Sequence, residues 1–549
     1  MPESATLQSR LIYEPQELKF GTSGRRGEVV HLTQLEIYIN VLAELRYLQS
    51  LPPGNGGIVR GDEFYFAHDL RPSSTTFVPE QQGYGEICQA VERAVRDAGM
   101  RPVNLGAIPT PALTYYALSH SRGSIMVTGS HIPFNRNGYK LNTSRGELLK
   151  EHEAPINIAV GRVRKQLYGQ LFADSQFDPR GVFKSGRRDL PPEAGDAESV
   201  YADRYTSFFQ GASLAGKRIL VYQHSAVGRD LLAAILERFG AEVLRSGRSE
   251  GFIPIDTENI DKPQLAAIQA LADEAAAKHG RIDAVVSTDG DSDRPLILGV
   301  DSATAEVRFF GGDLVGMVVA EYLGADAVVV PISCNDAIDR GCLARIVQPK
   351  TRIGSPYVIA GMEKARAEGR KTICGWEANG GFLTGSDIER NGRVLKQLPT
   401  RDAILPILAV LFAAQDRGLS LIQLFDSLPH RFSRAALLEN FPRAAGLKLV
   451  AQFSGDDPST RDRLQHFFTP SLGFGPIAGL NYTDGVRITF SNGDIAHFRP
   501  SGNADELRIY GVADTQERAD AIAELGIREP DGILRRMEAE ISGHPAQSR

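Results

Sequence analysis

Cysteine and tryptophan are scarce in this chain of 549 residues, which contains four cysteines and one tryptophan. No two cysteines form a CxxC pair, and none has a spacing to histidine that suits zinc. We therefore expect reduced, mostly buried thiols and neither a disulfide framework nor a zinc site. The cysteines are Cys88, Cys334, Cys342 and Cys374.

An excess of basic charge is also absent, since 61 Lys and Arg against 67 Asp and Glu give a formal net charge of −6. Such a chain has no broad basic field, so neither nucleic acid nor an anionic membrane is expected as its partner. The N-terminal residues lack the apolar core of a signal peptide. The longest apolar run, residues 404–414, is too short to span a bilayer. We expect a cytoplasmic protein with small-molecule partners; the oligomeric state stays open.

Strand-like and helix-like segments alternate along most of the chain. β-branched runs such as 283–290 alternate with alanine-rich stretches such as 264–280, which predicts α/β layers with mostly parallel strands. Residues 217–245 fit a strand–loop–helix–strand unit. Residues 479–510 contain alternating short strands and are followed by helical segments, which predicts a C-terminal α+β domain. The length predicts three to four domains.

One loop carries a candidate nucleophile. Residues 128–140 (TGSHIPFNRNGYK) place Ser130, His131 and Lys140 in a glycine-bounded loop after an apolar strand. The G-x-S-x-G turn of α/β-hydrolases is absent, because neither of its glycines is present. An ordinary turn serine is one interpretation. A phosphorylated Ser130, with about −1.5 to −2 charges, is the other, and its oxygens would be metal ligands.

A second loop, residues 289–294 (DGDSDR), places three carboxylates within five residues after another predicted strand. Two carboxylates about 4 Å apart repel by roughly 4 kcal/mol at an effective dielectric near 20. Asp289, Asp291 and Asp293 therefore favour a hard cation such as Mg²⁺, although a solvated acidic turn is an alternative. A calcium EF-hand is excluded because Arg294 replaces its glycine; this arginine suits phosphate instead.

Two further loops suit a sugar phosphate, although each alone could be an ordinary turn. In residues 375–381 (GWEANGG), Glu377 and Asn379 lie two positions apart and should point to the same side, as a pair for sugar hydroxyls would. Residues 499–508 (RPSGNADELR) can form a phosphate cradle from arginine side chains and backbone N–H groups. The candidates in this loop are Arg499, Ser501, Gly502, Asn503 and Arg508.

These loops together resemble those of the α-D-phosphohexomutase superfamily, which includes phosphoglucomutases and phosphomannomutases. The resemblance extends from Phe20 to Tyr510 in the family's order. Residues 20–27 (FGTSGRRG) resemble its N-terminal loop, and residues 68–74 (HDLRPSS) and 109–111 (PTP) resemble further segments of its first domain. The four loops described above resemble, in order, its phosphoserine, metal, sugar and phosphate loops.

The resemblance implies three similar mixed α/β domains followed by a smaller α+β domain, arranged around a central cleft. We place the four domains at residues 1–195, 196–302, 303–430 and 431–549. It also implies Mg²⁺ on the three aspartates and Ser130. Arg26, at the position of the family's active-site arginine, joins Ser130, His131 and Lys140 as the candidate catalytic residues. The substrate-binding candidates are Arg294 with the sugar-loop and phosphate-loop residues named above.

The implied reaction interconverts hexose 1-phosphate and hexose 6-phosphate. Phosphorylated Ser130 donates its phosphoryl group to a hexose monophosphate, and the resulting hexose 1,6-bisphosphate turns around and returns its other phosphate. The phosphate loop is most similar to those of phosphomannomutases, with phosphoglucomutase or a dual-specificity enzyme as the alternative. A sugar phosphatase and a silent sugar-phosphate binder are further alternatives.

The sequence also departs from the family pattern. Many bacterial members carry a histidine where this chain has Gly381, which shifts the expected proton-handling role to Lys140. Asn503 replaces a common threonine and keeps its hydrogen-bonding capacity. Residues 351–358 (TRIGSPYV) resemble the family's specificity loop without identifying a sugar.

Overall fold

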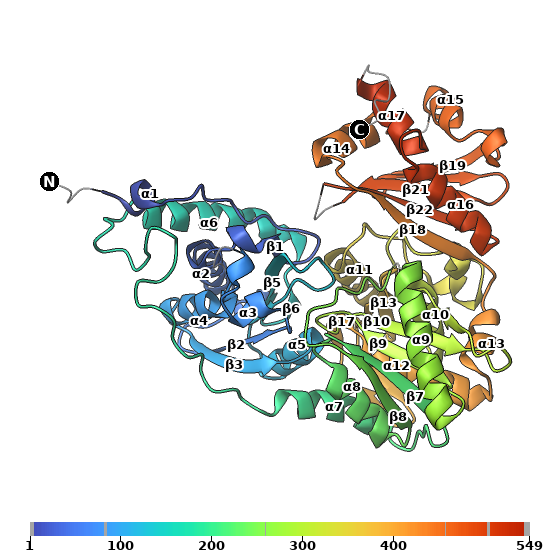
Figure 1. Ribbon diagram of the computed structural model, residues 1–549, viewed down its shortest axis with the longest axis horizontal. Helices are drawn as coiled ribbons and strands as arrows, with labels where there is room; N and C mark the ends of the chain where they lie inside the picture. The colour runs from blue at the N-terminus through green and yellow to red at the C-terminus, as the bar shows by residue number, and fades with distance from the viewer. Residues whose placement is uncertain (1–4, 82–84, 259, 456, 502–504, 543–549) are drawn as a thin grey trace.

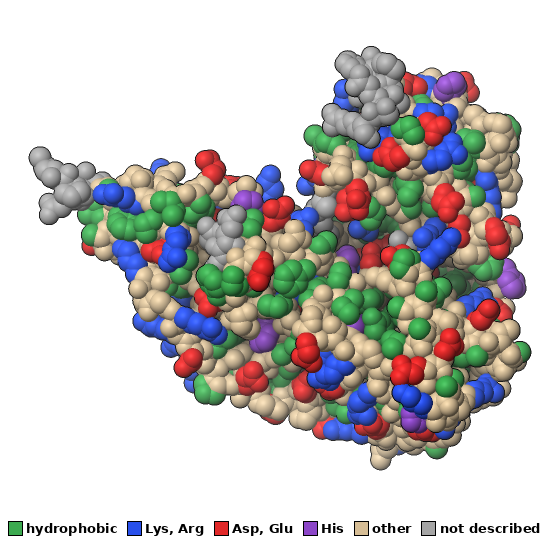
Figure 2. Space-filling model, viewed as in Figure 1, with side chains coloured by type: hydrophobic (Ala, Val, Ile, Leu, Met, Phe, Trp, Pro, Cys, Tyr) green, Lys and Arg blue, Asp and Glu red, His purple; other side chains and the backbone are tan. Residues whose placement is uncertain are grey.

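The computed structural model of the chain describes residues 5–81, 85–258, 260–455, 457–501 and 505–542. Layered sheets and helices follow one another along the chain, and the C-terminal part lies apart from the N-terminal lobe (Figure 1). A notch separates these two parts on the face shown in Figure 2. Among the helices of the described segments, none combines the length and apolar character needed to cross a membrane.

The first sheet comprises β1 (Arg25–Glu28), β2 (Glu63–His68), β3 (Arg101–Ala107), β4 (Ser124–Val127), β5 (Arg136–Thr143) and β6 (Gly146–Glu147). Its helices are α1 (Leu7–Arg10), α2 (Gln34–Ser50), α3 (Pro72–Thr75), α4 (Ile87–Asp97), α5 (Thr110–Ser119) and α6 (Glu153–Tyr168). The order is β1-β5-β4-β2-β3, with β6 beside β5. β2 is parallel to β3 and β4, whereas β5 is antiparallel to β4 and β1. All four residues of β4 are buried, as their apolar run predicts.

The second sheet comprises β7 (Arg218–His224), β8 (Glu242–Arg248), β9 (Ala284–Thr288), β10 (Pro295–Val300) and β11 (Val307–Phe309). Its helices are α7 (Ala197–Phe208), α8 (Arg229–Arg238) and α9 (Lys262–His279). β7, α8 and β8 confirm the unit predicted over residues 217–245. Because β11 pairs with β10, this sheet continues past residue 302, where we predicted a domain boundary.

The third part comprises β12 (Ala327–Val329), β13 (Ile373–Trp376), β14 (Phe382–Thr384), β17 (Leu398–Asp402) and the hairpin β15 (Ile388–Arg390) with β16 (Arg393–Leu395). Its helices are α10 (Gly312–Leu323), α11 (Ser355–Ala367), α12 (Ile404–Arg417) and α13 (Leu421–Asp426). Residues 404–414 of α12 are all buried, so the longest apolar run of the sequence is a core helix. It belongs to a hydrophobic core shared by the first three sheets.

The C-terminal part contains an antiparallel sheet with a core of its own. Its strands, in the order β18-β22-β21-β20-β19, are β18 (Phe432–Leu438), β19 (Ile477–Asn481), β20 (Val486–Phe490), β21 (Ile495–Pro500) and β22 (Leu507–Ala513). Its helices are α14 (Arg443–Gln452), α15 (Pro458–Phe467), α16 (Gln516–Ile527) and α17 (Ile533–Ser542). The predicted α+β character of this part is confirmed.

The prediction of mostly parallel strands is wrong in detail. In each of the first three sheets the parallel strands lie at one end of the strand order, and the rest of the sheet is antiparallel, as in the pairs β9–β10 and β13–β14. The alternation of strands and helices indicates crossover connections, but short hairpin returns such as residues 289–294 reverse the chain within five or six residues and make antiparallel neighbours. The sheets are mixed, as the family resemblance implies.

Candidate active site

The candidate nucleophile lies in the loop that follows β4. Ser130 is 3% exposed and has a backbone φ of 53°, in the left-handed region that costs a non-glycine residue conformational energy. Its backbone N–H donates to Thr128 Oγ1 at 2.7 Å, and its Oγ donates to Asp289 Oδ2 at 2.6 Å. The turn therefore directs the serine hydroxyl across to the loop that follows β9.

Two residues of the 68–74 segment hold this turn in place. Asp69 Oδ2 accepts from Thr128 Oγ1 at 2.7 Å and from the Gly129 N–H at 3.3 Å. The buried guanidinium of Arg71 donates to the carbonyl of Ser130 at 3.1 Å and to three other carbonyls of the same loop. The segment predicted only as part of the first domain thus supports the strained backbone of the candidate nucleophile.

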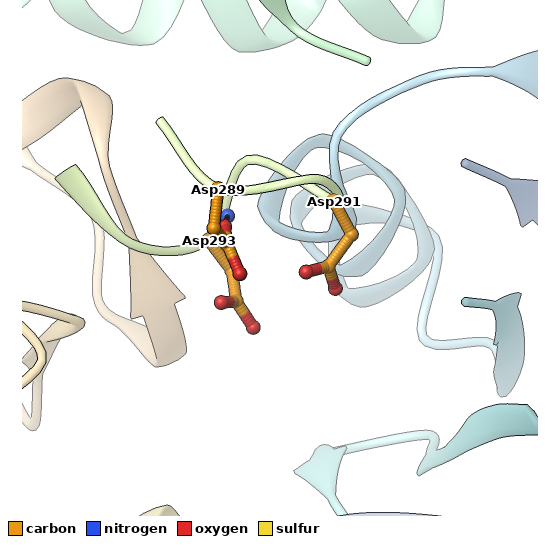
Figure 3. A group of neighbouring side chains, drawn as sticks. All are labelled: Asp289, Asp291 and Asp293. Carbon is orange, nitrogen blue, oxygen red and sulfur yellow. Dashed lines mark hydrogen bonds between the residues drawn. The ribbon is translucent and has the colours of Figure 1, made fainter. Parts of the chain in front are cut away.

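The three aspartates of the second loop form one compact group. Each offers a carboxylate oxygen within 4.8 Å of the others, and all three side chains are buried. Figure 3 shows the carboxylates of Asp289, Asp291 and Asp293 extending to the same side of their loop. The Oδ1 atoms of Asp291 and Asp293 are buried and have no hydrogen-bond partner among the described residues. Buried carboxylate oxygens that accept no hydrogen bond are the ligands that a hard cation requires, so these residues fit a metal.

Lys140 of β5 lies against the same carboxylates. Its Nζ donates to Asp291 Oδ2 at 2.5 Å and also pairs with Asp293 Oδ2. Burial disfavours the charged form of Asp291, but Lys140 outweighs it and holds the pKa of that carboxyl well below its usual range. Burial and the charges of Asp291 and Asp293 instead raise the pKa of Asp289. One ammonium therefore balances part of a three-carboxylate cluster.

His131 and Arg294 form a pair beside Ser130. Arg294 Nη1 donates to His131 Nδ1 at 2.8 Å, and the same Nδ1 is 3.5 Å from Ser130 Oγ. Burial and the positive charge of Arg294 lower the pKa of His131 to about 3. The imidazole is neutral near pH 7, and its hydrogen is on Nε2 because Nδ1 accepts. Arg26 lines the same cavity, and burial lowers its pKa to about 10, which leaves it charged.

The sugar loop follows β13. Glu377 is 3% exposed and lines the cavity with Asn379. The Asn379 side-chain oxygen accepts from the Gly381 N–H at 3.0 Å, which folds the loop on itself. Thr257 donates to the Asn379 carbonyl at 2.7 Å and thereby ties the sugar loop to the second sheet's segment. The carboxylate and the amide reach one cavity, as their spacing predicts.

Arg401, at the end of β17, was not predicted from the sequence. Its side chain is 3% exposed; Nε donates to Asp293 Oδ2 at 3.0 Å and Nη1 donates to Glu377 Oε2 at 3.1 Å. A Cβ atom added at Gly381 would lie 2.5 Å from Arg401 Cδ. This guanidinium therefore occupies the space that a side chain at position 381 would need, and it links the metal loop to the sugar loop. A lone arginine before an apolar helix gave no signal in the sequence.

The phosphate loop completes the cavity from the C-terminal part. Arg499 Nε is 3.4 Å from Asp484 Oδ1, and Arg508 is 3.7 Å from Glu258 and 3.6 Å from Glu506. Ser501 also lines the cavity. Two predicted members of this loop, Gly502 and Asn503, lie outside the described residues.

One cavity of about 80 Å³ is shared by all four loops. The structure therefore brings the described candidates of the phosphoserine, sugar and phosphate loops to one place, with the aspartates bonded to that lining. The described predicted residues that line it are Arg26, Ser130, His131, Lys140, Arg294, Glu377, Asn379, Arg499, Ser501 and Arg508.

Comparison with known proteins agrees with this arrangement. Residues 17–165 match the family model of "Phosphoglucomutase/phosphomannomutase, alpha/beta/alpha domain I", and residues 311–432 match domain III of the same family. A phosphomannomutase from Sinorhizobium fredii is 38% identical over 511 residues, which cover 93% of this chain and 98% of the relative. The chain belongs to the phosphoglucomutase/phosphomannomutase family.

Solved structures of the family share the fold. A phosphoglucomutase/phosphomannomutase family protein from Burkholderia thailandensis matches 96% of this chain and 98% of its own, with a TM-score of 0.65 and 17% identity. An Aspergillus fumigatus N-acetylphosphoglucosamine mutase, solved in complex with GlcNAc-6P and magnesium, matches 97% and 98% with a TM-score of 0.53 and 15% identity. The predicted superfamily, fold class and enzyme class, that of a phosphohexomutase, are confirmed. The roles of individual site residues stay predictions, as do the domain boundaries other than the one at residue 302, which the second sheet crosses.

Proposed function

We propose that this phosphohexomutase interconverts hexose 1-phosphate and hexose 6-phosphate through phosphorylated Ser130 and a hexose 1,6-bisphosphate, and that it acts as a phosphomannomutase. One observation carries the proposal. The Ser130 hydroxyl, 2.6 Å from Asp289, shares a cavity with the phosphate-loop arginines Arg499 and Arg508. A reacting hydroxyl and a second anion site in one cavity suit a substrate that carries a phosphate at one end and a hydroxyl at the other.

The carboxylates suggest how the transferring phosphoryl group is held. Asp289, Asp291, Asp293 and a phosphate oxygen on Ser130 would hold Mg²⁺, as the unpaired carboxylate oxygens and the magnesium complex of the Aspergillus relative suggest. When bound, the ion supplies charge neutralisation for the phosphoryl group. Lys140 lies at the same carboxylates and is our candidate for handling the proton of the substrate hydroxyl.

Three other side chains complete the proposed phosphoryl site. Arg26 and Arg294 supply fixed positive charge around Ser130, which favours the charge that spreads over the transferring phosphoryl oxygens. His131 is neutral and accepts from Arg294, so its proposed role is to orient that guanidinium and to donate through Nε2. Arg401 pairs with Glu377 and would thereby fix the position of the carboxylate that binds the sugar ring.

The same contacts must accept the bisphosphate in two orientations. Glu377 and Asn379 would bind the hydroxyls at C3 and C4, and Arg499, Ser501 and Arg508 would bind whichever phosphate is not reacting. Gly502 and Asn503 remain predicted partners of that phosphate. Mannose and glucose differ at C2, and none of these proposed contacts involves the C2 hydroxyl. Phosphoglucomutase or dual-specificity activity is therefore the alternative.

A ³¹P NMR time course tests the proposal. Purified protein with Mg²⁺ and a trace of glucose 1,6-bisphosphate is given mannose 1-phosphate, glucose 1-phosphate or glucosamine 1-phosphate in separate reactions. We expect conversion of mannose 1-phosphate to its 6-phosphate, loss of this conversion in Ser130→Ala, and its retention in Ser144→Ala. Inorganic phosphate as the main product would favour a phosphatase. No turnover of any sugar would favour a silent binder.

A further inference from the structure

Glu258 belongs to none of the four family loops, yet its side chain reaches the active-site cavity. It lies in the connection between β8 and α9 of the second sheet, and its side chain is 14% exposed. It lines the same cavity as Ser130 and Glu377. A charged carboxylate repels phosphate groups. Its presence in a cavity that is expected to receive two of them therefore calls for an explanation.

The partner of Glu258 comes from another part of the chain. Its Oε2 is 3.7 Å from Nη1 of Arg508 on β22, so the ion pair joins the second sheet's segment to the C-terminal domain. On the other side, Glu506 Oε2 is 3.6 Å from Arg508 Nη2. Both distances are longer than those of direct hydrogen bonds. Among the described residues, Arg508 is therefore oriented by charge, which leaves its donors available for shorter bonds to a phosphate.

Space for a rearrangement lies beside this pair. A second cavity, of about 400 Å³, has Glu258 and Tyr510 in its lining, and both residues also line the active-site cavity. The Glu258 side chain can thus turn away from Arg508 without leaving the boundary between the two cavities.

We propose that Glu258 takes the place of the substrate phosphate beside Arg508. It orients Arg508 in the absence of substrate and weakens the binding of a phosphate by Arg499 and Arg508, which together form the phosphate clamp. This inference rests on the proposed function, in which the bisphosphate must leave the phosphate site and turn around within each catalytic cycle. A clamp with uncompensated arginines would bind substrate and bisphosphate more tightly and slow the reorientation. Glu258 thereby acts as a positioning residue for the phosphate site.

The surroundings of Glu258 make its charge depend on pH near neutrality. Burial, together with the negative charges of Asp256 and Glu377, raises the pKa of Glu258 to about 7, although Arg508 opposes the shift. Below pH 7 the side chain is mostly neutral and competes little with phosphate; above pH 7 it is mostly charged. The charged and titratable groups that face it are Asp256, Arg294, Cys334, Glu377, Arg508 and Tyr510.

Calorimetric titration with inorganic phosphate and with mannose 6-phosphate tests the inference in the full chain. At pH 8 we expect Glu258→Gln to bind both anions about tenfold more tightly than the wild type. The second ionisation of phosphate affects both proteins alike, so the affinity ratio should fall towards one at pH 6. Glu258→Ala provides a second variant without a new amide donor. Glu250→Gln, on the same connection but 92% exposed, serves as the control and should match the wild type.

Equal affinities of wild type and Glu258→Gln at pH 8, or a ratio that is the same at both pH values, would overturn the proposal. In turnover, KM and kcat should both fall in the variant, whereas general damage would raise KM. The anion titration requires no mutase activity. A wild type that converts no sugar phosphate would therefore refute the proposed function while the role of Glu258 is still decided by binding.

Discussion

Removal of the Lys140 charge should strengthen metal binding and, at the same time, strongly lower kcat. The lysine ammonium contacts the carboxylates of Asp291 and Asp293, two of the three groups expected to hold Mg²⁺. A divalent cation and this ammonium compete for the same negative charge. Lys140→Met keeps most of the side-chain volume and removes only the competing charge.

The magnitude follows from the geometry of the pair. One ion pair at about 4 Å is worth about 4 kcal/mol at an effective dielectric near 20. The side chain is 7% exposed, so part of this attraction is offset by the desolvation of the ammonium. Half of one pair, about 2 kcal/mol, gives roughly 30-fold tighter Mg²⁺ binding in the variant. The proposed loss of the proton-handling amine should meanwhile lower kcat by about 100-fold or more.

Isothermal titration of the dephosphorylated proteins with Mg²⁺ measures the first effect, and the ³¹P assay measures the second. Lys350→Met is the control, because Lys350 is also paired at 2.5 Å but with Asp339 of another segment; its Mg²⁺ affinity should not change. A Lys140→Met protein that binds Mg²⁺ no more tightly than the wild type would refute the competition. The Lys140 ammonium would then not compete with Mg²⁺ for the carboxylates.

Three further predictions follow from contacts around the site. Asp69→Asn removes a charged acceptor beneath Ser130 and should lower kcat about tenfold with little change in KM; an altered KM alone would contradict this. Glu377→Gln should raise KM for the sugar phosphate about tenfold, because the sugar hydroxyls lose a charged acceptor and Arg401 loses its ion-pair partner. An unchanged KM would show that Glu377 does not bind the sugar. Burial lowers the pKa of His497 to about 3, below its unfolded value near 6.5. Stability should therefore be full above pH 6.5 and fall by up to about 1.4 kcal/mol per pH unit towards pH 3. In His497→Gln the free energy of unfolding, measured by hydrogen exchange of β21 and β22, should depend less steeply on pH.

Much of the site was predictable because its chemistry lies in short, contiguous loops at strand ends. Ser130 and the aspartates each follow a buried strand, so local pattern alone placed them at the edge of a sheet. The sugar loop follows β13 in the same way. Order along the chain then linked these loops to a family whose fold the structure confirms. These predictions needed no knowledge of which sheets meet.

The contacts that the sequence did not reveal are those between distant segments. Arg401 meets Glu377 across 24 positions and Asp293 across 108, and Glu258 meets Arg508 between two domains. No periodicity or spacing encodes such pairs, because they depend on how whole sheets pack. The mixed strand directions were missed for a related reason, since hairpin returns are set by turns of five or six residues within an otherwise alternating pattern.

Gly381 and Arg401 show how one departure from a family pattern is accommodated. A glycine at position 381 is needed once the arginine occupies this space, since an added Cβ would lie 2.5 Å from its side chain. The guanidinium cannot serve as a base, because it stays protonated in proteins. What it offers instead is permanent positive charge between Asp293 and Glu377. Arg401 therefore provides a fixed link between the metal loop and the sugar loop beside a residue without a side chain, and Lys140 is the amine that contacts the carboxylates expected to hold Mg²⁺.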